Sequence, residues 1–264
     1  MDDIESIALA AVAAYVWPLC RIAGFCGAMF PINGRGVPTR VRAMFAIVFT
    51  VCVMPSIPAP PADLELLSLG GFITTMKEVL IGIAIGYMTQ FLAQVFVMAG
   101  QVVAMQTGLG FASLVDPVSG TNTPVVGQFF TVLTTLVFLG INGHLLFFKL
   151  LLMSYDNMPI GGAFLPPAGL NEIFTFGSVM FMSALAMAIS SCCTMLVVNF
   201  TFGVMTRAAP QLNIFSMGFA VSMTVGLVVL TQTLNAFMGN FLNTVNAITE
   251  TTCSLIGTSC TGIF

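Results

Sequence analysis

Charged side chains are scarce in this chain. Only 6% of its 264 residues are Asp, Glu, Lys or Arg, whereas 58% are hydrophobic, and the mean hydropathy is +1.03. A soluble domain carries roughly 25% charged residues, so these side chains cannot cover a surface that faces water. The sequence therefore predicts an all-α membrane protein, organised as a single domain over residues 1–264.

Motifs for catalysis and metal binding are missing as well. The sequence has no GxSxG, HExxH or Walker motif, and its seven cysteines show no zinc-site spacing. The net charge of −3 comes without a dense basic cluster, which gives no indication of a nucleic-acid partner. The acidic start of the chain lacks the basic region of a cleavable signal peptide. We therefore expect no enzyme, no cofactor and no metal site.

The cysteines divide into two groups. Five of them lie in apolar runs, where a cysteine is usually a small buried hydrophobe. Cys253 and Cys260 lie in a polar tail. They pair if that tail faces an oxidising compartment and remain free thiols if it does not, and the sequence leaves both alternatives open.

One segment, residues 106–122, interrupts the apolar pattern near the middle of the chain. It contains three glycines, a proline and a carboxylate: Gly108, Gly110, Gly120, Pro117 and Asp116. Glycine admits backbone angles that other residues avoid, and proline ends a helix. Non-helical backbone at membrane depth survives only where protein buries it or where it lines a watery cavity. We therefore predict that this segment, the central loop, is the functional centre and occupies a pore.

The hydrophobic runs have unusual lengths. There are about six of them, at 7–31, 43–54, 79–115, 125–153, 173–206 and 212–234. The second covers about 12 residues, and the third and fifth about 37 and 34, whereas a spanning helix needs about 20. A helix of about 37 residues would be about 55 Å long against a bilayer core of about 30 Å. Such a run either breaks or packs within a protein assembly.

Charged residues inside or beside these runs need an explanation. Arg21 either meets a partner or extends its charge to the membrane surface. We interpret Lys77 and Glu78 as an ordinary interfacial boundary rather than as an ion pair with a neighbouring helix. Three arginines in the turn at 35–42 and one after the fifth run place these turns in the cytoplasm and the N-terminus outside. These arginines are Arg35, Arg40, Arg42 and Arg207.

Other polar or small residues repeat along single helical faces. Gln90, Gln94 and Gln101 share one face, which indicates interhelical hydrogen bonds or a wet surface. Gly82 and Gly86, four residues apart, allow close helix contact. At the interruption formed by residues 142–144, His144 is either a proton relay or, as we favour, a hydrogen-bonded packing residue.

The segment 234–249 predicts an amphipathic helix. Its apolar residues repeat at helical spacing, and Asn235, Asn240, Asn243 and Asn246 occupy much of the other face. A helix lying on a membrane surface would carry Lys and Arg there, and this face has none. The pattern favours contact with partner proteins or an aqueous conduit, and the alternative is an extended last membrane helix.

Several stretches resemble the FliR family of type III secretion export-gate proteins. They are QTGLGFASLVDP at 106–117, WPL at 17–19 with Arg21, VP at 37–38 with RVR at 40–42, VLIGIA at 79–84, NGH at 142–144 and RAAPQLNIF at 207–215. The resemblance covers most of residues 15–235. It implies bent helical hairpins that look like a FliP-like piece and a FliQ-like piece fused in one chain.

The resemblance also implies partners and a location. FliR-like proteins assemble with FliP and FliQ into a gate for unfolded flagellar subunits. FlhB, FlhA, the basal-body MS ring and membrane lipid surround this gate, which lies in the bacterial inner membrane, partly raised toward the periplasm. A virulence-type secretion homologue is the close alternative, and a polytopic secondary transporter is a more distant one.

The resemblance assigns roles to two sets of residues. The central loop would plug the channel through Gly108, Gly110, Phe111, Ala112, Leu114, Val115, Asp116, Pro117, Gly120 and Asn122. Phe111, Leu114 and Val115 would form an apolar constriction, and Asp116 would cap a helix or tie the loop to a wall. Partner contacts are expected at Arg21, Arg40, Arg42, Gln90, Gln94, Gln101, Asn142, His144, Arg207, Pro210, Gln211 and Asn213.

Overall fold

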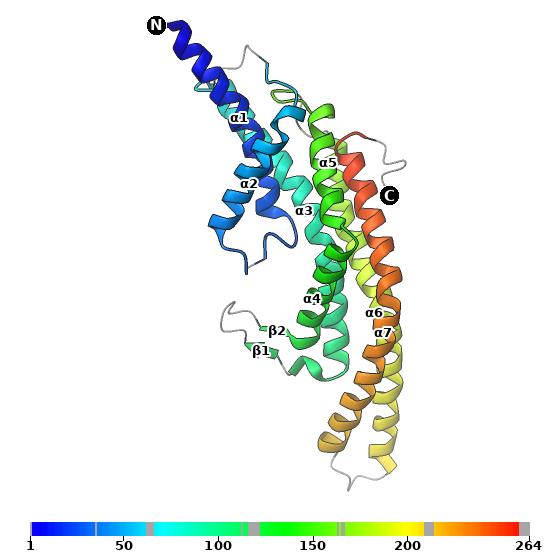
Figure 1. Ribbon diagram of the computed structural model, residues 1–264. Helices are drawn as coiled ribbons and strands as arrows, with labels where there is room; N and C mark the ends of the chain where they lie inside the picture. Colours follow the sequence, from blue (N-terminus) through cyan, green and yellow to red (C-terminus); the bar gives the residue numbers. More distant parts are fainter. Residues whose placement is uncertain are drawn as a thin grey trace. The chain divides into compact units, whose positions relative to one another are not determined.

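The computed structural model describes residues 2–34, 36–61, 66–111, 113–115, 122–162, 164, 167–208 and 214–258 (Figure 1). Seven α-helices make up most of the described chain, which confirms the all-α prediction. They are α1 (Asp2–Ala28), α2 (Thr39–Val53), α3 (Leu69–Gln106), α4 (Val125–Gly140), α5 (Gly143–Asn157), α6 (Pro167–Ala208) and α7 (Ile214–Leu255). Two short 3₁₀ turns, η1 (Met54–Ser56) and η2 (Leu109–Phe111), and two strands, β1 (Ser113–Val115) and β2 (Asn122–Pro124), complete the described elements.

The fifth run lies within one unbroken helix, whereas the third, predicted to extend to residue 115, leaves its helix after Gln106. Helix α3 has 38 residues, and α6 and α7 have 42 each. None of the three has a proline after its first residue, so no backbone N–H donor is missing from its interior. Helix α6 begins at Pro167, where a missing donor costs nothing, and therefore starts before the predicted residue 173.

The predicted interruption at residues 142–144 is a sharp bend. Helices α4 and α5 meet there at 66°. Asn142 adopts a left-handed conformation with φ of 58°, which asparagine tolerates better than most residues. A methyl group on Gly143 would lie 2.6 Å from the ring of Phe138, so this corner is tight. Helix α5 continues to Asn157, four residues beyond the end of the predicted run at residue 153.

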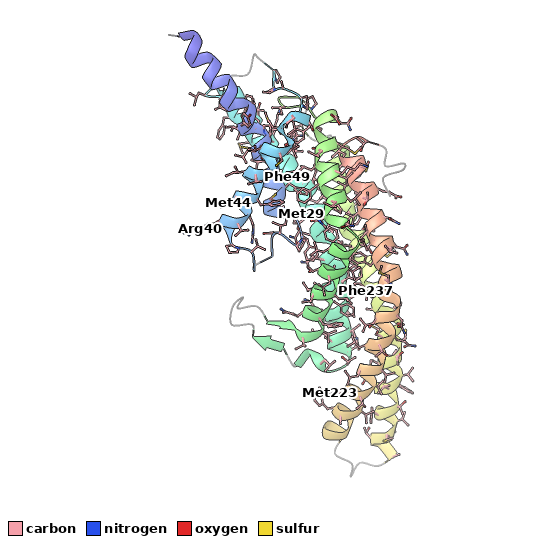
Figure 2. All side chains as sticks on the ribbon, in the orientation of Figure 1. Met29, Arg40, Met44, Phe49, Met223 and Phe237 are labelled. Carbon is pink, nitrogen blue, oxygen red and sulfur yellow. The ribbon has the colours of Figure 1, made fainter. Side chains whose placement is uncertain are left out.

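Within the described chain, four helices are long and apolar enough to cross a membrane, and the bent α4–α5 pair would make a fifth. These helices confirm a membrane protein, with fewer candidate spans than the roughly six runs of the sequence. The shortest is the segment 39–56, and the described residues leave most of its side chains uncovered; Met44, for example, is exposed (Figure 2).

The chain forms two compact units. Unit 1 comprises residues 1–91, 138–176 and 247–264, and unit 2 comprises residues 92–137 and 177–246. In unit 1, Trp17 and Tyr155 form a buried cluster with Ile57 and Ile160. In unit 2, phenylalanine rings from α3, α4 and α7 pack together at centroid distances of 4.7–6.0 Å; they are Phe96, Phe130, Phe237 and Phe241.

The predicted amphipathic helix at 234–249 is the later part of α7. Phe237 and Phe241 are buried, while Asn235 and Asn243 are exposed. Met238 and Leu242 of the apolar pattern are also exposed, so the predicted apolar face is only partly buried. The helix is continuous with the preceding apolar run, as the alternative of an extended last helix supposed.

The cysteines differ from expectation. Of the five in apolar runs, all are free thiols, but only Cys26 is buried; Cys52 and Cys193 are exposed. The expectation of small buried hydrophobes is therefore wrong for most of them, because their helices leave much of their surface uncovered. Cys253 is disulfide-bonded, and Cys260 lies outside the described residues.

Candidate functional site

The central loop begins where α3 ends. The Thr107 hydroxyl donates hydrogen bonds to the carbonyl oxygens of Val103 and Ala104 at 2.9 and 3.3 Å, and its backbone N–H donates to Val103 at 3.0 Å. Gly108 follows with φ of 76°, a conformation that side chains disfavour. The chain therefore leaves the helix through a tied threonine and a glycine turn.

Beyond this turn the loop is a small β-hairpin. Strands β1 and β2 pair antiparallel, with Leu114 opposite Thr123 and Val115 opposite Asn122 (Figure 1). The sequence analysis did not anticipate these strands. The sequence does contain a feature that could have indicated them: each strand has a β-branched residue, and the stretch between the strands contains Pro117 and Gly120.

The individual plug residues are only partly described. Ala112, Asp116, Pro117 and Gly120 lie outside the described residues. For Phe111, Leu114, Val115 and Asn122 the structure gives the backbone alone. Their roles in a constriction stay predictions.

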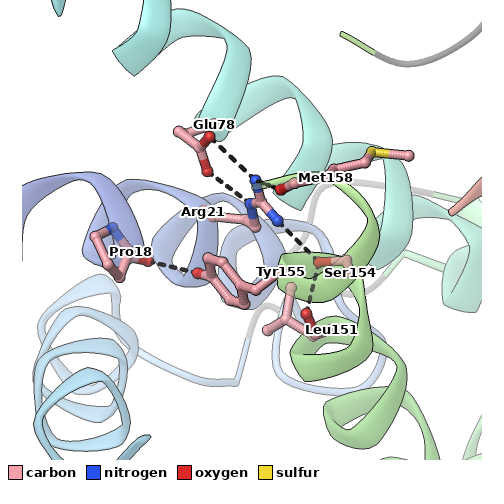
Figure 3. A network of polar contacts seen from close by, with 7 residues as sticks. All are labelled: Pro18, Arg21, Glu78, Leu151, Ser154, Tyr155 and Met158. Atoms are coloured by element: carbon pink, nitrogen blue, oxygen red, sulfur yellow. Dashed lines mark hydrogen bonds and ion pairs between the residues drawn. The ribbon is translucent and has the colours of Figure 1, made fainter. Parts of the chain in front are cut away.

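A buried ion pair in unit 1 is the best-defined polar site. Arg21 of α1 donates from Nε to Glu78 Oε2 at 2.6 Å and from Nη2 to Oε1 at 3.0 Å (Figure 3). The two side chains are 0% and 2% exposed. Such a two-bond arrangement satisfies both partners with fixed geometry.

Helix α5 and the turn after it complete this site. Arg21 also donates to Ser154 Oγ at 3.1 Å and to the Met158 carbonyl at 2.8 Å. Its guanidinium carbon lies 4.2 Å from the ring centre of Tyr155, whose hydroxyl donates to the Pro18 carbonyl at 3.1 Å (Figure 3). The arginine therefore ties α1, α3 and α5 together, and its charge is fully compensated.

The network settles two sequence interpretations. Arg21 meets a partner, as one alternative held, and does not extend to a membrane surface. The interpretation of Glu78 as an interfacial boundary is wrong, because close packing of α1 on α3 brings it to Arg21.

Glycines permit this close packing. A methyl group on Gly24 would lie 2.6 Å from the Val79 carbonyl oxygen, and one on Gly86 would lie 2.7 Å from that of Phe25. A methyl group on Gly82 would overlap the Arg21 carbonyl oxygen. The close helix contact predicted for Gly82 and Gly86 is confirmed.

The other expected contact residues are scattered. Arg42 fixes its own loop through the Asn33 side chain and the carbonyls of Gly34 and Val37 at 2.9–3.0 Å. Gln90 donates to the Ala28 carbonyl at 2.9 Å and so serves the packing of α1 on α3. Arg40, Gln94, Asn142 and Arg207 are exposed, and Gln101 is half-buried.

His144 is half-buried, and its Nδ1 has no hydrogen-bond partner among the described residues. The hydrogen bond predicted for His144 is therefore not made by Nδ1 within the described part of the chain. Pro210, Gln211 and Asn213 lie outside the described residues. Within the described chain, no group of three His, Cys, Asp or Glu side chains is placed to hold a metal ion.

Comparison with known proteins identifies the family. Residues 12–248 match the family described as bacterial export proteins, family 1. The flagellar biosynthetic protein FliR of Escherichia coli is 35% identical over 81% of each chain. That of Pectobacterium carotovorum is 30% identical over 83% of each chain, and that of Bacillus subtilis is 26% identical over 92% of this chain and 94% of its own. The chain therefore belongs to the FliR family of bacterial export proteins and is a membrane component of the flagellar export apparatus.

Proposed function

We propose that this chain is a structural, pore-forming and gating subunit of the flagellar type III export apparatus. It assembles with FliP and FliQ into the channel for unfolded flagellar subunits, and its central loop closes that channel. The observation that carries the proposal is the hairpin of β1 and β2, which leaves the end of a 38-residue apolar helix through the turn at Gly108. Such backbone needs a protein or water environment at membrane depth.

Uncovered helix faces support the assembly. In the most apolar stretches of α6 and α7, only 28% and 22% of residues are buried within the chain. On α6, Phe200 is 73% exposed, and Asn199 beside it and Thr194 are also exposed. A helix that leaves both large apolar and polar side chains uncovered fits protein partners better than lipid alone.

The remaining partners and the location belong to the same proposal. The gate lies in the bacterial inner membrane within the flagellar basal body, partly raised toward the periplasm inside the MS ring, and contacts FlhB, FlhA and lipid. The relatives reported above carry flagellar names, which favours the flagellar branch over a virulence-type homologue.

Co-purification tests the assembly. An affinity-tagged chain expressed with FliP and FliQ should be recovered as one monodisperse complex in detergent. The chain expressed alone should aggregate, because its exposed apolar faces lack partners. Size-exclusion chromatography distinguishes the two results. Recovery of a stable monomer that transports a small solute would contradict the proposal and support a transporter.

Deletion of residues 111–121 tests the plug. The shortened chain should still assemble, because the deletion leaves every α-helix intact, but the membrane should leak ions. Conductance of the reconstituted complex in a planar bilayer measures the leak.

A matched control changes a different loop. Pro58→Ala alters the exposed segment after η1 and should leave the complex sealed. If the complex without residues 111–121 assembles and its conductance does not exceed that of this control, the central loop is not the plug.

A further inference from the structure

The root of the central loop packs against helix α7 within unit 2. Thr107 is 0% exposed. A methyl group on Gly226 of α7 would lie 2.6 Å from Thr107 Cβ and 2.8 Å from Thr107 Cγ2. Carbon atoms that are not bonded prefer about 3.5–4.0 Å. Position 226 therefore has room for a hydrogen atom and for nothing larger.

Thr107 is held in place from its other side. Its hydroxyl is hydrogen-bonded to the carbonyls of Val103 and Ala104. Turning the side chain away from α7 would break these bonds within a buried site, which is costly. A group added at Gly226 would therefore displace the Thr107 backbone rather than rotate its side chain.

The next residue transmits that displacement to the hairpin. Gly108 lies beside the ring of Phe219, since a methyl group on Gly108 would be 3.4 Å from Phe219 Cε2. Gly108 is also the turn at which the chain leaves α3, and η2 and β1 follow directly. Two successive residues at the root thus rest on two residues of α7.

We propose that Gly226 is a positioning residue for the gate: its fit against Thr107 sets the resting, closed position of the central loop. This inference rests on the proposed function, because it assumes that the loop closes a channel. It also goes further, since it assigns to α7 the role of seating the plug. Any partner that shifts α7 would then shift the loop.

The test is Gly226→Ala in the complete complex with FliP and FliQ. Overpacking by one methyl group destabilises the closed position of the loop, and a tenfold change in the closed-to-open ratio corresponds to about 1.4 kcal/mol. We expect an assembled gate whose resting conductance rises about 10-fold.

Rescue distinguishes seating from a general disturbance. Thr107→Gly removes both carbon atoms that the new methyl group meets, and glycine is well tolerated after the end of a helix. The double variant Thr107→Gly/Gly226→Ala should conduct less than Gly226→Ala, because the clash is gone, but more than the wild type, because the Thr107 hydrogen bonds to Val103 and Ala104 are lost as well. Gly239→Ala is the matched control, because a methyl group at Gly239 on the same helix meets nothing within 4 Å; it should remain sealed.

Two results would overturn the inference. An assembled Gly226→Ala gate that stays sealed, while deletion of residues 111–121 leaks, leaves the proposed function standing and removes the seating role. If Gly226→Ala leaks and the double variant Thr107→Gly/Gly226→Ala leaks as much, the seating role of Gly226 is likewise removed. If both the deletion and Gly226→Ala stay sealed, the proposed function itself falls.

A second variant keeps the inference testable if the Gly226→Ala complex does not assemble. If Gly226→Ala yields no complex, Thr107→Ile crowds the same contact from the loop side. A raised conductance in that variant supports the inference, and a sealed, assembled complex overturns it.

Discussion

Replacing Arg21 by methionine is expected to destabilise the chain by about 3–5 kcal/mol, the usual cost of breaking a buried ion pair from one side. The substitution leaves the carboxylate of Glu78, which is 2% exposed, without its two guanidinium hydrogen bonds. It also removes the bonds to Ser154 and Met158 from α5 and the turn after it. Thermal melting of the tagged complex, followed by fluorescence-detected size-exclusion chromatography, measures the loss.

The expected shift is large. For a chain of this size each kcal/mol corresponds to about 2–4 °C, so the melting temperature should fall by about 10 °C. Lys149→Met is the matched control, because Lys149 is an exposed cation of α5 in the same unit. It should change the melting temperature by no more than about 4 °C, since exposed charges contribute at most about 1 kcal/mol.

A double variant separates the charge from the packing. Arg21→Met/Glu78→Met removes both charges and fills the site with apolar side chains of similar length. Such replacements of a buried pair are often neutral or stabilising, so the double variant should melt well above Arg21→Met alone. If the two melt at the same temperature, the penalty comes from lost contacts to α5 and not from an orphaned carboxylate.

The partner of Arg21 shows where sequence reasoning stops. An arginine in an apolar run predicts that some partner exists, and that prediction is confirmed. Which residue it is depends on how α1 packs on α3, and Glu78 lies 57 positions away. The sequence feature that could have indicated Glu78 is the set of glycines near Arg21 and Glu78. Glycines allow two helices to pack closely, and an acidic residue between closely packed helices is buried.

Local patterns were more informative than long-range contacts. Helical periodicity predicted the buried phenylalanines and the exposed asparagines of the later part of α7, and the residue types at 142–144 predicted the bend between α4 and α5. The seat of the central loop on Gly226 was beyond such reasoning. A glycine within an apolar helix is common in membrane proteins, and nothing near it in the sequence points to Thr107.

Gly82→Leu is expected to be at least as damaging as Arg21→Met. Even a methyl group at Gly82 would overlap the Arg21 carbonyl oxygen and lie 2.9 Å from the Phe25 backbone nitrogen. Both groups belong to the backbone of α1, which cannot rotate away as a side chain can. Helix α1 must therefore move off α3, and Arg21 must move away from Glu78 with it.

The cost should follow the size of the substitution. Gly82→Ala should lose about 1–3 kcal/mol, the range for overpacking, and Gly82→Leu more than about 3 kcal/mol, because it adds the loss of the ion pair. Gly27→Ala is the control on α1 itself, since a methyl group there meets nothing within 4 Å. It should leave stability unchanged or raise it by up to about 1 kcal/mol, because alanine favours a helix over glycine. Equal melting temperatures for Gly82→Leu and Gly27→Ala would show that α1 and α3 can separate at Gly82 without loss, and the close contact would then not be what holds Arg21 against Glu78.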